Sequence, residues 1–298
     1  MNNFVPNKHQ GLVVSHFGAQ VAVEAEDGQI FQCQLHRNQT LPVVGDQVAW
    51  ELTQHETGVI TAIMPRRSLL ARGDGHGKMK PIAANIDLMV IVMAPPPIFS
   101  EYLIDRYLVA AELLKIEPMI VLNKIDLLDE NTAPAAYARL APYQRIPYST
   151  VLSSVVQAGT GLVDLAASLT QKTAVLLGPS GVGKSSIIAA LSENEIRIGD
   201  VSMKGIGKHT TTATRLYHLP QGGQLIDSPG VREFALWPVE RQALLSGFKE
   251  FAPFTAQCKF RNCQHVAEPG CAVQAAIAAG NISPIRFENY CTLLKEKW

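Results

Sequence analysis

The sequence contains no run of about 18 consecutive apolar residues, the length that a membrane-spanning helix needs. Its first residues, MNNFVPNKHQ, also lack the apolar stretch of a secretory signal. The chain has no net charge, because Lys and Arg total 26 and Asp and Glu total 26. Bulk charge therefore neither favours nor excludes a nucleic-acid partner. We expect a soluble, cytoplasmic protein that has no contact with a membrane.

Cysteine is scarce and unevenly distributed. The 298 residues include five cysteines, an odd number, and three of them fall between residues 258 and 271. In a chain without a secretory signal, such a cluster favours a metal site over disulfide bonds. The apolar fraction of 47% is enough for buried cores, and the length gives room for two or three domains.

Residues 1–66 have the pattern of a small all-β domain. Strand-like sequences recur along it, at QVAVEA (20–25), QIFQCQL (29–35), DQVAWEL (46–52) and GVITAI (58–63). The first two are joined by Asp27-Gly28, a strong hairpin turn. About five short strands in this length predict a barrel of the OB-fold type. Acidic residues outnumber basic ones here, so bulk charge does not mark the barrel as an RNA-binding module. It could still bind RNA, or it could dock a protein or pack on the next domain.

The next stretch, MPRRSLLARGDGHGKMKPIAAN (64–85), contains Gly, Arg and Lys throughout. This composition predicts a mobile basic linker. Such a linker could touch phosphate groups, or it could simply be solvated.

Residues 67–235 form the predicted second domain, in which strand and helix patterns alternate. The segment IDLMVIVMA (86–94) is a continuous apolar run, as expected of a parallel strand that is buried on both faces. An amphipathic helix follows at 100–114, with Ser100 as its N-cap. Further strands are predicted at 117–126, 148–154 and 173–178, further helices at 160–169 and 185–192, and a hairpin at 214–230. This alternation predicts a parallel sheet with helices on both faces.

The Gly-rich sequence that follows the strand at 173–178 matches the motif G-x-x-x-x-G-K-[ST] in full. It consists of Gly178, Pro179, Ser180, Gly181, Val182, Gly183, Lys184 and Ser185, with Ser186 directly after it. Glycine lets the backbone N–H groups wrap around phosphate, and the next helix adds its partial positive charge. We expect Lys184 to reach the β- and γ-phosphates, where it assists catalysis, and Ser185 to bind Mg²⁺.

A second motif, Asn123-Lys124-Ile125-Asp126, fits N-K-x-D at the end of a predicted strand. The Asp126 carboxylate can accept hydrogen bonds from N1–H and N2–H₂ of guanine, a donor pair that adenine lacks. Asn123 can fix the base edge and brace the phosphate loop, while the stem of Lys124 covers the ring. The segment LSSVVQAG (152–159) can supply the N–H group that reads guanine O6, near Ser153 and Ser154.

A third motif, DSPG (227–230), fits D-x-x-G at the end of the predicted hairpin. Asp227 would contact Mg²⁺ through water, and the N–H group of Gly230 would sense the γ-phosphate. The base motif therefore precedes the phosphate loop, which is the reverse of the usual order in GTPases. Strands of one sheet can be cut and rejoined in this way when the original termini lie close together. The central domain is thus predicted to be a circularly permuted P-loop GTPase that binds GTP and GDP.

Residues 236–298 form the third predicted domain, which is mainly α-helical, with helices at 238–251 and 271–280. The candidate metal ligands here are Cys258, Cys263, His265 and Cys271. Three thiolates and one imidazole predict a closed, structural Zn²⁺ site. The residues around it are mildly basic, a surface that either faces RNA or is merely solvated: Lys249, Lys259, Arg261, Arg286, Lys295 and Lys297.

These three domains and their motifs resemble the RsgA (YjeQ) family, bacterial GTPases of late small-ribosomal-subunit maturation. The resemblance covers almost the whole chain, and its most telling motifs are NKID, GPSGVGKSS (178–186), GKHTTTA (207–213), DSPGVREF (227–234) and the cysteine cluster. It implies RNA-dependent docking on the small ribosomal subunit, activated GTP hydrolysis, and release once the subunit is mature. We expect the protein to act as a monomer.

The residue that positions the attacking water is not the usual one. Many GTPases place a glutamine directly after D-x-x-G, but this chain has Val231, which can neither donate nor accept a hydrogen bond. The nearest group is His209, beside threonines of which Thr211 is expected to bind Mg²⁺. An imidazole can hydrogen-bond water at neutral pH, and the family resemblance gives His209 this role. A solvent-exposed histidine without a role is the alternative. We expect low basal turnover that the small subunit stimulates.

Two other functions remain open on the sequence alone. The protein could be a GTP-dependent adaptor whose partner is another protein and whose slow hydrolysis acts as a timer. It could also be a P-loop ATPase or kinase, if the N-K-x-D match were a coincidence.

Overall fold

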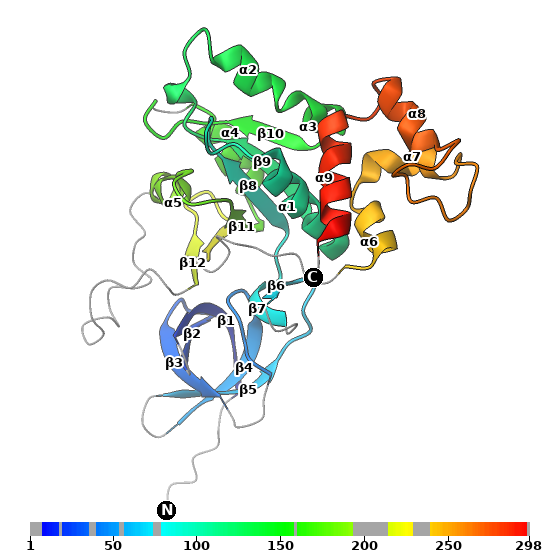
Figure 1. Cartoon of the computed structure of the whole chain (residues 1–298). Helices are drawn as coiled ribbons and strands as arrows, with labels where there is room; N and C mark the ends of the chain where they lie inside the picture. Colours follow the sequence, from blue (N-terminus) through cyan, green and yellow to red (C-terminus); the bar gives the residue numbers. More distant parts are fainter. Residues whose placement is uncertain are drawn as a thin grey trace, which may run out of the picture.

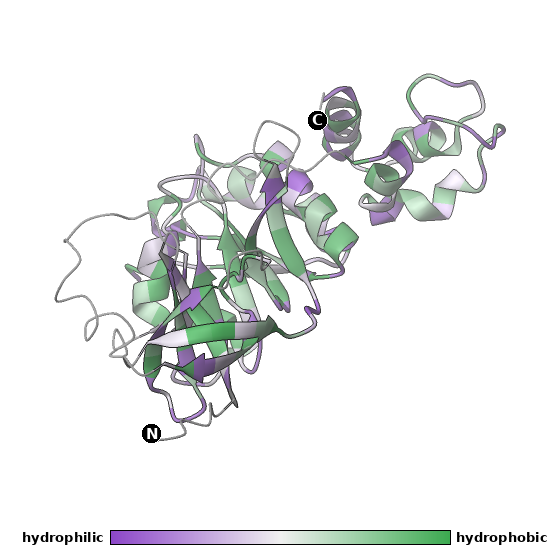
Figure 2. Cartoon of the chain, turned by 90° about the horizontal axis from the view of Figure 1, so that it is seen from below, coloured by the Kyte–Doolittle hydropathy of each residue, from purple (hydrophilic) through white to green (hydrophobic). Residues whose placement is uncertain are grey.

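The computed structural model describes residues 8–17, 20–35, 40–53, 57–73, 79–157, 160–192, 214–228 and 239–296. The chain forms an N-terminal barrel, a central layered α/β part and a C-terminal group of helices (Figure 1). Figure 2 shows hydrophobic segments gathered in the middle of the molecule. Within the part that the structure describes, no helix has both the length and the apolar character needed to cross a bilayer.

The N-terminal part is a closed five-stranded barrel, as predicted. Its strands are β1 (Lys8–Phe17), β2 (Gln20–Ala25), β3 (Ile30–Leu35), β4 (Gln47–Leu52) and β5 (Gly58–Ile63). They pair in the order β1-β2-β3-β5-β4, and a further pairing of β1 with β4 closes the barrel. Inward-facing side chains such as Val21, Val48, Trp50 and Ile60 fill it. The sequence pattern did not reveal β1, which alternates only weakly.

The prediction of a mobile linker at 64–85 is wrong for the residues described. This stretch contains two antiparallel strands, β6 (Leu69–Gly73) and β7 (Met79–Ala84). Leu70 and Ala83 are fully buried in the main hydrophobic core. The apolar residues of the two strands therefore anchor this stretch in the core, a tertiary contact that the basic, Gly-rich composition did not indicate.

The central part contains the predicted sheet, in the order β10-β9-β8-β11-β13-β12. Its strands are β8 (Leu88–Met93), β9 (Glu117–Leu122), β10 (Ser149–Leu152), β11 (Thr173–Leu177), β12 (Arg215–His218) and β13 (Gln224–Asp227). All pairings are parallel except that of β12 with β13. Every residue of β8 is buried, as its apolar run predicted.

Helices cover both faces of this sheet. They are α1 (Glu101–Leu114), α2 (Ala133–Ala138), α3 (Ala141–Arg145), α4 (Leu162–Leu169) and α5 (Lys184–Leu191). One core contains Ile104 and Leu108 of α1, and the core on the other face contains Leu165 of α4 and Ile187 of α5. Ser100 is the N-cap of α1, as predicted, and accepts a hydrogen bond from the N–H group of Leu103.

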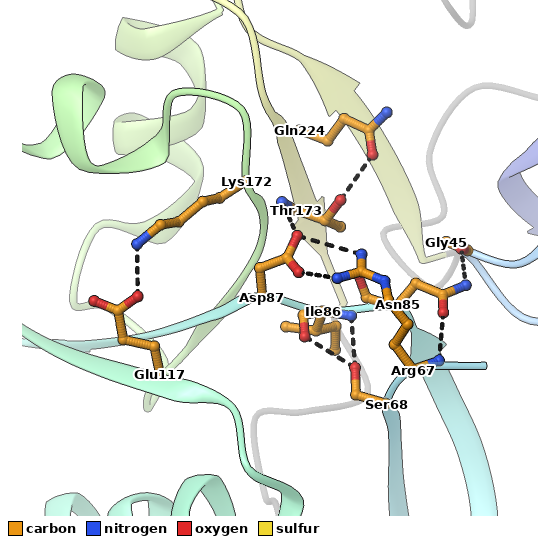
Figure 3. A network of polar contacts seen from close by, with 10 residues as sticks. All are labelled: Gly45, Arg67, Ser68, Asn85, Ile86, Asp87, Glu117, Lys172, Thr173 and Gln224. Carbon is orange, nitrogen blue, oxygen red and sulfur yellow. Dashed lines mark hydrogen bonds and ion pairs between the residues drawn. The ribbon is translucent and has the colours of Figure 1, made fainter.

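A polar network joins the barrel to the start of the central sheet (Figure 3). The Asn85 side chain donates to the carbonyl of Gly45 and accepts from the N–H group of Arg67, both at 2.9 Å. The Arg67 guanidinium pairs with Asp87, whose carboxylate accepts the N–H group of Thr173 at 3.0 Å. The strands β8 and β11 are thus tied to the barrel at the edge opposite the Gly-rich motif.

The C-terminal part is mainly helical, as predicted. It contains α6 (Arg241–Ser246), a 3₁₀ turn (Lys249–Phe251), α7 (Ala252–Thr255), α8 (Ala272–Ala278) and α9 (Pro284–Lys295). The single helix predicted at 238–251 is too long, because α6 ends before Gly247. A Cβ atom at Gly247 would lie 2.8 Å from Val109 of α1, so the chain needs glycine there to pack closely.

A buried ion cluster holds α9 against α1. The Arg286 guanidinium, which is 0% exposed, donates to Asp105 at 2.7 Å and to both oxygens of Glu250 at 2.7 and 2.8 Å. Asn289 also donates to Asp105, at 2.6 Å. Burial opposes the charge on Arg286, but the two carboxylates outweigh it and raise the pKa of the guanidinium.

Candidate functional site

The Gly-rich loop lies between the end of β11 and the start of α5. Gly178, Gly181 and Gly183 have φ angles of 138°, 84° and 98°, which residues with a Cβ atom rarely adopt. Lys184 is the first residue of α5, and its Nζ donates to the carbonyls of Gly178 and Pro179, both at 2.7 Å. The ammonium therefore lies across the loop, where it can meet a phosphate group.

The remaining residues of the motif follow the same turn and helix. Ser180 and Val182 lie within the loop, and Val182 is fully buried. Ser185 and Ser186 lie in the first turn of α5. The hydroxyl of Ser185 thus belongs to a helix start that directly follows the loop, the position from which such a hydroxyl can reach a metal ion on phosphates.

The structure brings the N-K-x-D motif to the Gly-rich loop. Asn123 is 1% exposed, and its side-chain amide donates to the carbonyl of Val182 at 2.8 Å. A Cβ atom at Gly183 would lie 2.4 Å from that amide nitrogen, so glycine is required where the two motifs meet. The Ser153 hydroxyl donates to the Asn123 oxygen at 3.1 Å, which settles the orientation of the amide.

The candidate base reader, Asp126, is held by Ser154. The Ser154 hydroxyl donates to Asp126 Oδ1 at 2.5 Å and accepts the N–H groups of Val156 and Gln157 at 3.2 and 3.0 Å. Asp126 lies in a 3₁₀ turn that starts at Ile125, directly after Lys124 in the left-handed region. The carboxylate is therefore fixed in orientation.

Parallel strands explain why these residues meet. Leu152 of β10 pairs with Leu122 of β9, so Ser153 and Asn123 both follow a strand at the same edge of the sheet. In addition, the N–H group of Asn123 donates to the carbonyl of Met93 at the end of β8. The order β9-β8-β11 then places the N-K-x-D motif within reach of the loop after β11.

Asp227 is the last residue of β13, which pairs in parallel with β11. Because it lies at the carboxyl end of this strand, it is at the same edge of the sheet as the Gly-rich loop. Gly230, Thr211 and His209 lie outside the residues that the structure describes, so their predicted roles stay predictions.

The four candidate zinc ligands converge. Their ligand atoms all lie within 4.8 Å of one another. His265 Nδ1 is 3.5 Å from Cys258 Sγ and 3.5 Å from Cys271 Sγ, and these two sulfur atoms are 3.9 Å apart. A tetrahedral zinc ion with Zn–S bonds of about 2.3 Å places its sulfur ligands about 3.8 Å apart. The cluster, completed by Cys263, therefore fits a zinc ion.

The electrostatics differ between the thiols of the cluster. Burial and the neighbouring thiols of Cys271 and Cys258 raise the pKa of Cys263 to about 12. Burial opposes ionisation of Cys258, but N–H groups of Ala272 and Val273 point at its sulfur and lower the pKa of the thiol. Burial lowers the pKa of His265, so its imidazole stays neutral. A thiolate and a neutral imidazole are the forms that bind zinc.

The predicted basic surface around this cluster needs one correction. Arg286 cannot face RNA, because it is fully buried in the ion cluster with Asp105 and Glu250. Lys249 pairs with Glu112 and lies 3.9 Å from the centre of the Tyr148 ring. Lys259 and Arg261 are exposed, and Lys297 lies outside the described residues.

Sequence reasoning missed one residue next to the Gly-rich loop. Tyr107 of α1 is 1% exposed, and a backbone hydrogen bond with Gly178 holds its hydroxyl. Burial raises the pKa of this phenol to about 12, so it stays protonated. No motif marks the residue, because in the sequence it is one more apolar position on the buried face of a helix.

The chain combines a parallel sheet with a base motif, a Gly-rich phosphate loop and D-x-x-G, and these motifs follow one another in an order rotated from that of ordinary GTPases. This combination defines the class of circularly permuted GTPases. The solved structures agree. The crystal structure of YjeQ from Thermotoga maritima matches with a TM-score of 0.77 and 31% identity, covering 98% of this chain and all of that one. The structure of YloQ, described as a circularly permuted GTPase, matches with a TM-score of 0.74 and 26% identity over both full lengths.

Sequence comparison then gives the family. The model of the RsgA GTPase family matches residues 63–237. The small ribosomal subunit biogenesis GTPase RsgA of Haemophilus influenzae (strain PittGG) is 46% identical over 292 residues, covering 96% of this chain and 84% of that protein. The protein of the same name from Pseudomonas fluorescens (strain Pf0-1) is 47% identical over 295 residues, with 97% and 85% covered. The chain belongs to the RsgA GTPase family and is a GTP hydrolase.

Proposed function

We propose that this GTPase binds the small ribosomal subunit and hydrolyses GTP during late maturation of that subunit. The observation that carries the proposal is the similarity to relatives named small ribosomal subunit biogenesis GTPase, which extends over 96% of the chain. It therefore includes the barrel and the helical region as well as the nucleotide site. In this proposal the two flanking parts contact the subunit.

In the proposed nucleotide site, Lys184 contacts the β- and γ-phosphates and Asp126 reads the guanine edge. Ser185 and Thr211 bind Mg²⁺, and Asp227 contacts it through water. The Mg²⁺ ion would neutralise charge on the phosphates. The support from the structure is that Lys184, Asp126 and Asp227 all lie at one edge of one sheet.

We assign the orientation of the attacking water to His209, since Val231 has no hydrogen-bonding side chain. In this proposal the small ribosomal subunit activates the step, so basal turnover is low. His209→Ala should abolish the stimulated rate and leave GTP affinity unchanged. A variant that keeps full stimulated turnover would assign the role to a ribosomal group instead.

The cysteine cluster supports one structural zinc ion, bound by Cys258, Cys263, His265 and Cys271. A closed Cys₃His set leaves no open position for water, so the ion would stabilise the fold rather than act in hydrolysis.

Co-sedimentation with purified small subunits tests the proposed function. Binding should be strong with a non-hydrolysable GTP analogue and weak with GDP. Large subunits, as the control, should not bind in either state. A protein that binds neither subunit, while its nucleotide binding is intact, would favour a GTP-dependent adaptor acting on another protein.

A further inference from the structure

The barrel and the central sheet are joined by strand pairing close to Asp227. Strand β1 of the barrel pairs antiparallel with β12, with Ser15 opposite Arg215. Arg215 in turn lies opposite Asp227 across the antiparallel pair β12–β13. A barrel residue, a hairpin residue and the proposed magnesium-site carboxylate therefore form one row across three neighbouring strands.

Hydroxyl groups continue this connection beside the row. The Ser15 hydroxyl donates to the carbonyl of Thr214 at 3.4 Å, and the Thr214 hydroxyl lies 3.1 Å from that of Ser228. Ser15 is 7% exposed and Ser228 is 2% exposed. Buried hydroxyl groups keep their hydrogen-bond partners, because an unpaired one costs free energy. The residue directly after Asp227 is thus tied to the barrel through Thr214.

A second contact fixes the far end of β12. His218, its last residue, forms a 2.7 Å contact between Nε2 and Oε2 of Glu24 on β2. Between the two ends, Val14 of β1 and Leu216 of β12 belong to the same hydrophobic core. The barrel therefore contacts β12 at both ends, through Ser15 opposite Arg215 and through Glu24 at His218.

We propose that barrel strand β1 is a positioning element of the magnesium site, with Ser15 and Thr214 as its positioning residues. These residues hold the end of β13, and the end of β13 sets where the Asp227 carboxylate lies. Groups that orient a metal-site carboxylate commonly change metal affinity when they are removed. The inference rests on the proposed role of Asp227 in contacting Mg²⁺ through water.

The test is the Mg²⁺ concentration that gives half-maximal GTP hydrolysis by the full-length protein. Ser15→Ala and Thr214→Val should each raise it about tenfold, the size of effect common for groups around a metal site. GDP affinity measured in EDTA should stay at the wild-type value, because the phosphate loop and base reader are untouched. Asp227→Asn is the positive control, and Glu26→Gln, an exposed change on the barrel, is the matched negative control.

The outcomes separate the inference from the proposed function. If Asp227→Asn raises the Mg²⁺ requirement while Ser15→Ala and Thr214→Val behave as wild type, the barrel has no positioning role. If Asp227→Asn changes nothing, the proposed role of Asp227 is wrong, and the inference falls with it. A loss of EDTA-measured GDP affinity in the two positioning variants would show general damage and would also contradict the proposal.

Should these variants fail to fold, hydrogen exchange of the wild-type protein decides the question. Coupling between two sites is reciprocal, so Mg²⁺ with a GTP analogue should slow amide exchange in residues 13–16 of β1. The same analogue in EDTA should not. Equal exchange of these amides in both conditions would overturn the proposal.

Discussion

The side-chain amide of Asn123 donates a 2.8 Å hydrogen bond to the carbonyl of Val182, a residue 59 positions further along the chain. The contact joins the base motif to the phosphate loop. It does not depend on which motif comes first, because the strand order β9-β8-β11 alone brings the two loops together. The permuted order therefore leaves the chemistry of the site intact.

Removing this amide should weaken the whole nucleotide site. Asn123→Ala leaves the carbonyl of Val182 and the hydroxyl of Ser153 without their buried partner. We expect a loss of about tenfold or more in affinity for both GTP and GDP, measured with a fluorescent nucleotide. Asn131→Ala, at an exposed position, is the control. Unchanged affinity in Asn123→Ala would mean that the two motifs do not act as one site.

Guanine specificity should depend on Asp126. In Asp126→Asn the acceptor for the N1–H and N2–H₂ groups is lost, so preference should shift from GTP towards the xanthine nucleotide. Ser154→Ala keeps the carboxylate but removes its 2.5 Å hydrogen bond, and should weaken GTP binding without changing the preference. Competition between GTP, ATP and XTP measures both effects. An Asp126→Asn protein that still selects GTP over ATP as well as wild type would refute the assignment.

Zinc should be lost when a ligand is replaced. Cys263→Ser removes one of four converging ligands, so the metal should dissociate and the region around 258–271 should lose its structure. Nucleotide binding should remain, because the two sites lie in different parts of the molecule. Cys291→Ser, which changes a cysteine outside the cluster, is the control. Metal analysis that finds no stoichiometric zinc in the wild-type protein would contradict this prediction.

The ion cluster between α1 and α9 should be important for stability. Arg286→Met leaves Asp105 and Glu250 without their cation in a buried site. Breaking a buried pair in this way costs about 3–5 kcal/mol of unfolding free energy. Urea denaturation should show the loss, whereas Arg145→Met, at an exposed position, should leave the midpoint unchanged. A stability equal to wild type in Arg286→Met would show that the apolar contacts of α9 suffice.

The sequence predicted those features that depend on particular residues at fixed spacing. The Gly-rich loop, N-K-x-D and the Cys/His cluster need defined chemistry, and the structure places them where strands end or ligands converge. Strands β2 to β5 of the barrel could be predicted from their alternating pattern and from the Asp27-Gly28 turn, whereas β1 could not.

Features that depend on tertiary contacts could not be predicted. The β6–β7 hairpin is stabilised by burial of Leu70 and Ala83 in a core built from distant segments. The sequence suggested an exposed position for Arg286, because its buried partner Asp105 is 181 residues away along the chain. The contacts of Ser15 with β12 likewise have no local signal in the sequence.

The proposed work of this circularly permuted GTPase on the small ribosomal subunit should be visible in its kinetics. The measurement is the steady-state rate of GTP hydrolysis, with and without purified small subunits. We predict a low rate for the protein alone, strong stimulation by small subunits, and none by large subunits. A rate that small subunits leave unchanged, in a protein that binds GTP normally, would contradict the proposed function.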